Sequence, residues 1–169
     1  MKKLHLLTLS ALALLAAPAA SFAQASGVWT SPCSASTTLD HMSLMKYSAV
    51  GSSLLFGPTR TGTIVARYNV TNTSVPSDLT PAWGFLQFGY TDLGAGTATA
   101  TLYEVTPCTG AIEEICQVNS DDLPGQGVCN VCQFATTQFD FVLHLYYVEV
   151  KLTRPDTASV IQANTLRIF

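Results

Sequence analysis

The amino-acid sequence predicts an all-β protein, an antiparallel β-sandwich of about eight strands with a Greek-key or jelly-roll path. Thr occurs twenty times beyond residue 23, together with many Val, Phe and Tyr residues, and these residue types fit a pleated strand. Gly and Pro recur at short intervals between the segments rich in these residues. Short strands separated by turn residues are typical of sandwiches and barrels.

The clearest predicted strand spans Gly62 to Thr71, in which apolar and mostly polar residues alternate. A period of two residues indicates a strand that is buried on one face. Three further segments have the residue types of strands, and Trp83 is expected in the core because the segment that it begins is apolar on both faces. These segments are Trp83–Asp92, Thr97–Thr106 and Ala111–Asn119.

Two more segments near the end of the sequence are predicted as strands. In Phe139–Thr153 the apolar residues occupy odd positions up to Leu145 and even positions from Tyr146. Such a change of face predicts a β-bulge, or a strand that passes between two sheets. Ser159–Phe169 is the last predicted strand, whereas Leu39–Tyr47 fits either a strand or one face of a helix.

The first 23 residues have the pattern of a secretory signal peptide. Lys2 and Lys3 precede an apolar run, and Ser21-Phe22-Ala23 supplies the small residues of a cleavage site. We therefore expect a signal peptide at residues 1–23, cleaved after Ala23, and a single β-sandwich domain at residues 24–169. The short, Ala- and Leu-rich form indicates a bacterial protein that is secreted or periplasmic. No second apolar run in the mature chain is predicted to cross a membrane as a helix.

The charge pattern excludes one class of partner. The chain has 8 Lys and Arg residues against 11 Asp and Glu residues, which gives a formal charge of −3. The sequence contains no run of basic residues, and proteins that bind nucleic acid need such basic surface to contact the phosphates. Nucleic acid is therefore not expected as a partner.

Five cysteines beyond residue 23 predict structural disulfides, because an exported protein matures in an oxidising compartment. They are Cys33, Cys108, Cys116, Cys129 and Cys132. An odd number leaves one thiol unpaired, and the sequence alone allows fifteen sets of pairings. Turn residues between Cys116 and Cys129 suggest that these two face each other across a hairpin, and Cys108 would then pair with Cys132 or Cys33.

The Cys129-Asn130-Val131-Cys132 motif has two functional alternatives, a redox dithiol and half of a zinc site. The residues after Cys132 do not have the pattern of the helix that a redox motif needs. The gap between Cys108 and Cys116 is too wide for the second tight pair of a zinc site. Structural disulfides therefore remain the favoured interpretation.

Catalytic constellations are sparse in the sequence. His144 would share a strand face with Asp140, and no Gly-x-Ser-x-Gly nucleophile motif occurs. A glycosidase needs two carboxylates that face one cleft, and the sequence cannot pair any two of its acids in this way. The acids considered are Glu104, Glu113, Glu114, Asp140 and Glu149. Three oxygen-bearing residues in one turn could bind Ca²⁺, although such a turn needs no ion: Asn119, Asp121 and Asp122.

Exposed aromatic residues on a sandwich could form a platform for a glycan, and Trp29, Tyr146 and Tyr147 are the ones expected to be exposed. The sequence favours a non-enzymatic exported protein that acts by binding or structural association at the cell surface or in the periplasm. A glycan or another surface protein is the expected partner, with no cofactor and no metal. Two alternatives remain open: a small secreted hydrolase with an acid/His site on a sheet face, and a pilus-like assembly subunit joined by strand addition.

Overall fold

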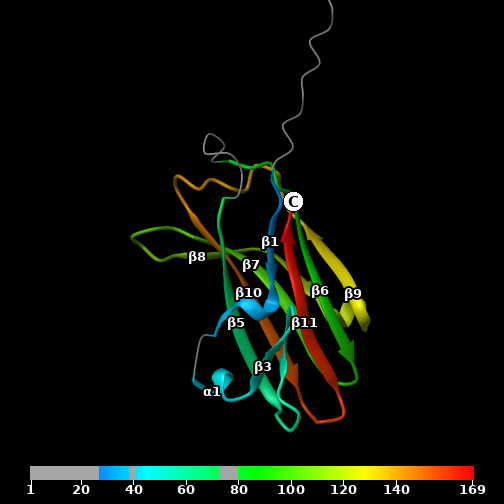
Figure 1. The fold of residues 1–169 in the computed structure, drawn as a ribbon. Helices are drawn as coiled ribbons and strands as arrows, with labels where there is room; N and C mark the ends of the chain where they lie inside the picture. Colours follow the sequence, from blue (N-terminus) through cyan, green and yellow to red (C-terminus); the bar gives the residue numbers. More distant parts are fainter. Residues whose placement is uncertain (1–26, 39–40, 73–79) are drawn as a thin grey trace, which may run out of the picture.

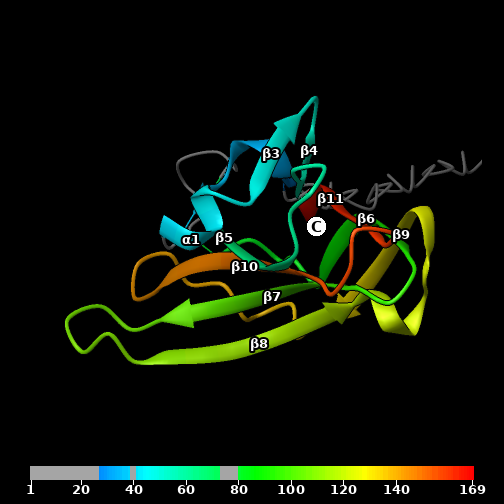
Figure 2. The same ribbon diagram turned by 90° about the horizontal axis from the view of Figure 1, so that it is seen from below.

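The computed structural model describes residues 27–38, 41–72 and 80–169, which form two antiparallel sheets packed face to face (Figure 1). The first sheet contains, in order, β3 (Tyr47–Val50), β4 (Ser53–Phe56), β11 (Val160–Ile168), β6 (Phe85–Leu93) and β9 (Gly125–Gln133), with β1 (Trp29–Pro32) paired to β11. The second sheet contains β2 (Thr37–Thr38), β5 (Gly62–Val70), β10 (Leu145–Arg154), β7 (Thr97–Val105) and β8 (Ile112–Asn119). The two layers are separate when the molecule is seen from below (Figure 2).

The strand order is that of a jelly roll, so the predicted fold class is confirmed. The eight strands from β4 onward lie in the orders β4-β11-β6-β9 and β5-β10-β7-β8. The chain therefore changes sheet after β4, β5, β6, β8, β9 and β10, and only β7 and β8 follow each other within one sheet, as two interleaved Greek keys require. The short strands β1, β2 and β3 are additions to this framework.

Three short helical turns connect the strands of the described residues: η1 (Cys33–Ala35), α1 (His41–Leu44) and η2 (Ser120–Asp122). The ambiguous segment Leu39–Tyr47 contains α1 and the first residue of β3, and its residues 39–40 lie outside the described part. The predicted signal peptide at residues 1–23 also lies outside the described residues.

The strand predicted at Phe139–Thr153 begins only at Leu145. The Asp140 carboxylate accepts hydrogen bonds from the backbone N–H groups of Val142, at 2.9 Å, and Leu143, at 3.2 Å. These bonds fold residues 140–144 into a turn, which explains the change of face without a bulge or a change of sheet.

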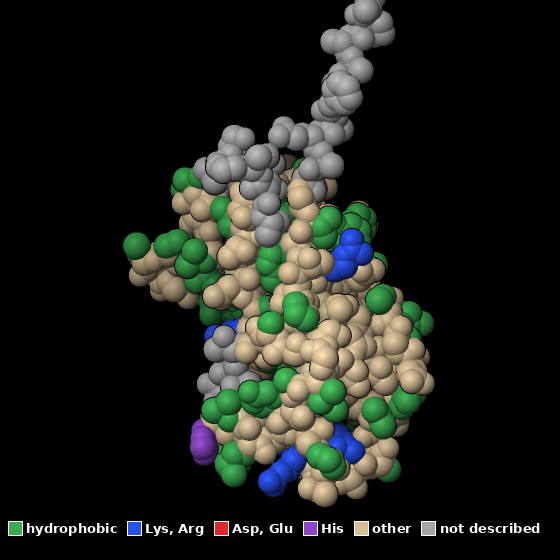
Figure 3. Space-filling view, in the orientation of Figure 1, with side chains coloured by type: hydrophobic (Ala, Val, Ile, Leu, Met, Phe, Trp, Pro, Cys, Tyr) green, Lys and Arg blue, Asp and Glu red, His purple; other side chains and the backbone are tan. Residues whose placement is uncertain are grey.

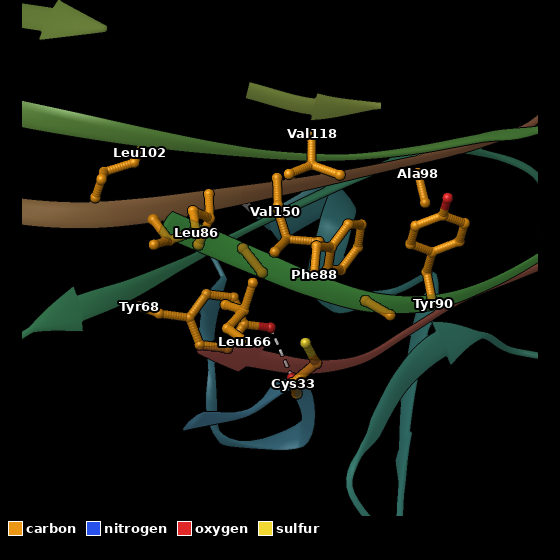
Figure 4. Packing of buried hydrophobic residues seen from close by; sticks show 14 of the residues in the cluster. Cys33, Tyr68, Leu86, Phe88, Tyr90, Ala98, Leu102, Val118, Val150 and Leu166 are labelled. Carbon is orange, nitrogen blue, oxygen red and sulfur yellow. Dashed lines mark hydrogen bonds between the residues drawn. The ribbon is translucent and has the colours of Figure 1, made fainter. Parts of the chain in front are cut away.

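The core lies between the two sheets and collects every second residue of the central strands β5 and β10, whereas the edge strand β9 has no fully buried residue. Phe88 and Leu166 from the first sheet face Val150 and Leu102 from the second (Figure 4). The Tyr68 hydroxyl, also buried, donates a hydrogen bond of 2.7 Å to the Cys33 carbonyl. Trp83 is fully buried, as its sequence context predicts.

A disulfide joins Cys116 to Cys132, so the expected approach of Cys116 to Cys129 across a hairpin is wrong. The reason is topological, because β8 and β9 are edge strands of different sheets and do not pair with each other. The residues between them, including η2, carry the chain from one sheet to the other. The disulfide therefore ties the two sheets together at one edge of the sandwich.

Candidate functional site

The outer face of the second sheet carries a mixed aromatic and polar surface. Along β10 the side chains of Tyr146, Val148 and Val150 point into the core, which leaves the odd positions on the outer face. The strand register places Tyr147 between Asn69 on β5 and Tyr103 on β7, and it places Glu114 on β8 opposite Tyr103. We call these four residues the tyrosine row: Asn69, Tyr147, Tyr103 and Glu114.

The two tyrosines of this row stack on each other. Their ring centroids lie 5.1 Å apart with 27° between the ring planes. The Arg67 guanidinium carbon lies 4.7 Å from the centroid of the Tyr147 ring. Tyr147 is thus held between Tyr103 and Arg67, and burial raises the pKa of its hydroxyl, with Arg67 partly opposing that rise. Within the tyrosine row, the Tyr103 ring lies on the β8 side of the Tyr147 ring, next to Glu114.

A second row of side chains runs parallel to the first, two residues along the strands. Arg67 pairs with Glu149, with Nη2 at 2.9 Å and Nε at 3.0 Å from Oε2. On the other side of Glu149, Gln117 donates a hydrogen bond of 2.9 Å to the Thr101 hydroxyl. We call these residues the polar row: Arg67, Glu149, Thr101 and Gln117. The row places charged and amide groups beside the tyrosine rings, while Thr101 itself is buried.

A groove of about 370 Å³ continues this surface along the same face. Its lining consists of three threonines, one amide and one ammonium group: Thr97, Thr99, Thr153, Gln117 and Lys151. Beyond the tyrosine row, in the opposite direction, the face ends in the exposed apolar residues Leu145 and Ile112. One face therefore changes from apolar to aromatic to polar along its strands.

The outer face of the first sheet is different in character. In the orientation of Figure 3, which shows the side of β11 and β6 seen in Figure 1, no Asp or Glu side chain is in view. Its outward positions include Gln87, Gln162, Thr165 and Arg167. At its upper end the Phe85 and Phe169 rings stack at 5.6 Å, with Arg167 over Phe169 at 5.3 Å.

A second groove, of about 310 Å³, opens beside β4 and β11 and is lined mainly by apolar residues. Its charged lining residue is Arg154, whose guanidinium donates to four backbone carbonyls. Because these bonds occupy the guanidinium, we assign Arg154 a structural role.

Two of the three aromatic residues expected at the surface are buried. Trp29 and Tyr146 expose only 4% and 3% of their surface, so neither presents a ring face to a ligand. The Tyr146 hydroxyl donates to the Gln138 carbonyl at 3.0 Å and accepts from the Asp140 N–H at 2.8 Å. Burial raises the pKa of Tyr146 to about 12, an effect that the hydrogen bond from Asp140 partly offsets. The apolar even positions of β10 already indicate that Tyr146 points inward.

Tyr147 lies on the outer face and is partly exposed. Tyr103 and Arg67 are the residues of this surface that sequence reasoning did not select. Alternation within Thr97–Val105 is enough to place Tyr103 on the face of β7 that points away from the core, because Ala100 and Leu102 occupy the buried face. The contact of Tyr103 with Tyr147 depends on the register between two strands, which no local pattern reveals.

The predicted pairing of His144 with Asp140 is replaced by a pairing with Glu104. His144 Nδ1 lies 3.0 Å from Glu104 Oε1, although the two atoms are not aligned for a hydrogen bond. Gln138 donates a 3.0 Å hydrogen bond to the other carboxylate oxygen of Glu104. Asp140 instead holds the turn described above, so it does not orient the imidazole.

The remaining cysteines are unpaired, and the structure explains why the Cys129–Cys132 motif does not form a dithiol. Cys129 is exposed, whereas Cys132 points toward the core side of β9 and bonds to Cys116. Residues three apart on a strand lie on opposite faces. Cys108 is exposed in the β7–β8 turn, and burial raises the pKa of the buried Cys33 thiol to about 12.

Among the described residues, no group of three or more His, Cys, Asp and Glu side chains is placed to hold a metal ion. In the turn considered for Ca²⁺, the side-chain oxygens of Asn119 and Asp121 have local hydrogen-bond partners. Asn119 accepts the Asp121 N–H at 3.0 Å and so caps η2, and Asp121 accepts the Thr97 hydroxyl at 3.3 Å. Over the same part of the chain, none of the helices has the length and apolar character needed to cross a membrane.

No family model and no curated protein matches the chain. Among solved structures, a variant of a family 29 carbohydrate-binding module complexed with cellulohexaose is 12% identical, covers 85% of this chain and 80% of its own, and has a TM-score of 0.34. The family 11 carbohydrate-binding module from Clostridium thermocellum, with a mixed-linked tetrasaccharide, is 9% identical over 85% and 84%, with a TM-score of 0.39. A structure of infectious bursal disease virus is 12% identical over 84% and 32%, with a TM-score of 0.33. Similarities as weak as these do not establish a shared function.

Proposed function

We propose that this protein is a non-enzymatic binding protein that holds a saccharide on the outer face of its second sheet, across β10, β7 and β8. The observation that carries the proposal is the stack of Arg67, Tyr147 and Tyr103 on an accessible sheet face. A pyranose ring has one face of C–H groups and a rim of hydroxyls. A tyrosine ring can contact the first, and polar side chains beside it can bond the second.

The groups next to the stack supply both donors and acceptors. The exposed amide of Gln117 lies in the polar row, where the buried Thr101 hydroxyl accepts its hydrogen bond, and the groove beyond adds three threonine hydroxyls and the Lys151 ammonium. Tyrosine also loses little conformational freedom when it binds, because it has few rotatable bonds. The stack with Arg67 holds the Tyr147 ring in place before any ligand arrives.

In this proposal the working protein is the mature domain of residues 24–169, exported from a bacterium and released by cleavage after Ala23. The signal pattern of residues 1–23 supports export. The Cys116–Cys132 disulfide also fits an oxidising compartment. The intact mass of the exported protein tests the cleavage site.

Binding to a panel of immobilised polysaccharides tests the proposal. We expect Tyr103→Ala to weaken binding by about tenfold or more, because it removes the ring that borders β8 and leaves Tyr147 without its stacking partner. Phe85→Ala is the matched control, since it removes one ring of the stacked phenylalanine pair on the other sheet. A saccharide whose binding survives Tyr103→Ala but is lost with Phe85→Ala would place the site on the opposite face.

Hydrolysis is the second candidate function, and the observation that favours it is the 3.0 Å approach of His144 to Glu104. Release of reducing ends by the purified protein, abolished by Glu104→Gln or His144→Ala, would support it over binding alone. The assembly alternative has less support. Both β1 and β11, the first and last described strands, are paired within the first sheet, so within the described residues neither end detaches from it.

A further inference from the structure

The tyrosine and polar rows already contain a bound cationic group, which is the side chain of Arg67. Its guanidinium lies over the Tyr147 ring at 4.7 Å and contacts the Glu149 carboxylate at 2.9 Å. An aromatic face combined with an adjacent carboxylate stabilises a cation through the ring quadrupole and through charge. We therefore expect this face to favour a ligand that carries a cationic group.

An aromatic ring beside a carboxylate also occurs on the β8 side of the stack, at Tyr103 and Glu114. Tyr103 pairs with Glu114 across the β7–β8 ladder, directly after a β-bulge that separates this pair from the Leu102–Cys116 pair, and Glu114 is exposed. Side chains directly opposite each other on neighbouring antiparallel strands have Cβ atoms about 5 Å apart. Within the described part of the chain, Tyr147 is the one ring in contact with Tyr103. No Arg or Lys of that part lies over the Tyr103 ring.

The charge of the molecule favours the same class of ligand. The chain has a formal charge of −3, and β8 carries Glu113 beside Glu114 with no Lys or Arg on the strand. A cationic ligand would approach this edge of the sandwich with a favourable long-range field, whereas an acidic one would be repelled.

We infer that the Tyr103–Glu114 position binds the ammonium group of an amino sugar, so that the saccharide recognised by this protein carries free amino groups. The inference rests on the saccharide-binding function proposed above. In it, the ammonium group contacts the face of Tyr103 and the carboxylate of Glu114. The neighbouring sugar hydroxyls then meet the exposed amide of Gln117 in the polar row.

Isothermal titration of the mature protein with three oligosaccharides of equal length tests the inference: a glucosamine hexamer, an N-acetylglucosamine hexamer and cellohexaose. The pH is mildly acidic, so that the free amino groups are protonated. We expect the glucosamine hexamer to bind at least about fivefold more tightly than the two uncharged oligomers, the range of an exposed cation–aromatic contact combined with one charge pair. Tyr103→Ala should weaken all three.

Two substitutions separate local recognition from net charge. Glu114→Gln removes the carboxylate while keeping its shape, and we expect it to weaken the glucosamine hexamer by about fivefold and leave the N-acetylated hexamer unchanged. Glu113→Gln is the matched control, because it makes the same change of net charge one residue away on the other face of β8. We expect it to change the affinity by less than about twofold.

Three results would overturn the inference. Equal binding of the glucosamine and N-acetylated hexamers, with loss on Tyr103→Ala, leaves saccharide binding intact and removes the amino-sugar assignment. Equal weakening by Glu113→Gln and Glu114→Gln shows general charge attraction instead of a site. Tighter, Glu114-dependent binding of oligolysine assigns the position to a cationic peptide. If none of the three oligosaccharides binds, the proposed saccharide function itself has failed.

Discussion

Arg154 is a charged side chain inside the sandwich, and its partners are all backbone carbonyls. It is 8% exposed, and its guanidinium donates to Ser159 at 2.7 Å, Thr157 at 2.5 Å, Arg60 at 3.2 Å and Gly57 at 3.3 Å. These carbonyls belong to the β10–β11 turn and to the segment after β4. One side chain thus holds together two connections at the lower end of the molecule.

We predict that Arg154→Met lowers the free energy of unfolding by about 3 kcal/mol, because it removes the donor of one buried and three partly buried hydrogen bonds to backbone carbonyls. Urea denaturation of the purified protein measures this loss. Arg167→Met is the matched control, since Arg167 carries the same charge on the exposed surface, and its substitution should cost less than about 1 kcal/mol. A similar loss in both variants would show that charge, and not carbonyl bonding, is responsible.

At the scale of the element, the edge strands β8 and β9 are joined by a covalent bond between the two sheets. The Cys116–Cys132 disulfide closes a loop with a sequence separation of 16 residues. We predict that Cys116→Ser combined with Cys132→Ser lowers the free energy of unfolding by about 3 kcal/mol, because the unfolded chain regains the freedom of that loop. Denaturation with and without a reducing agent measures the effect.

Cys129→Ser provides the control and also separates the two pairings considered for Cys116. Cys129 is an exposed free thiol, so its substitution should leave the unfolding free energy within about 0.5 kcal/mol of the parent protein. A loss comparable to that of the double variant, together with a Cys116–Cys129 peptide on digestion, would contradict the pairing seen in the structure.

The strands also show which structural features can be predicted from the local residue pattern and which cannot. A period of two along Gly62–Val70 or Thr97–Val105 predicts which side chains share a face, and the structure confirms these alternations. The crossing from β8 to β9 was not predictable, because a turn rich in Asn, Asp and Gly serves a hairpin and a change of sheet equally well. For the same reason the alternation within β7 could place Tyr103 on the outer face, while its contact with Tyr147 could not be predicted. Register between strands is set by the packing of the whole core.

At the scale of the whole molecule, one fold presents two unlike outer surfaces. The first sheet shows an outer face without acidic side chains in view (Figure 3), whereas the second carries Glu114, Glu149, Arg67 and Lys151 around its tyrosines. The interior is shared by both sheets and contains ionisable groups that contact one another, including Cys33 and Tyr68 (Figure 4). These buried groups connect the stability of the entire sandwich to pH.

The direction of that dependence follows from the pKa shifts. Burial raises the pKa of Cys33 from 9.0 to about 12, and that of Tyr146 from 10.0 to about 12. Burial also raises the pKa of Tyr68. Between pH ~9 and pH ~12 the folded protein therefore holds protons that the unfolded chain has released. Stability is complete below the unfolded pKa values and is lost as the pH rises toward the folded ones.

We predict that the denaturation midpoint falls markedly between pH ~8 and pH ~11. The measurement uses a Cys108→Ser, Cys129→Ser background, so that exposed thiolates cannot attack the Cys116–Cys132 bond at high pH. Tyr146→Phe and Cys33→Ala each remove one buried ionisable group. Each should reduce the difference between the two pH values, whatever its effect on stability at pH ~8. An equal pH-dependent loss in the background protein and in both substituted proteins would mean that the alkaline transition begins at the surface. A smaller loss in the substituted proteins would assign it to ionisation of groups shared between the two sheets.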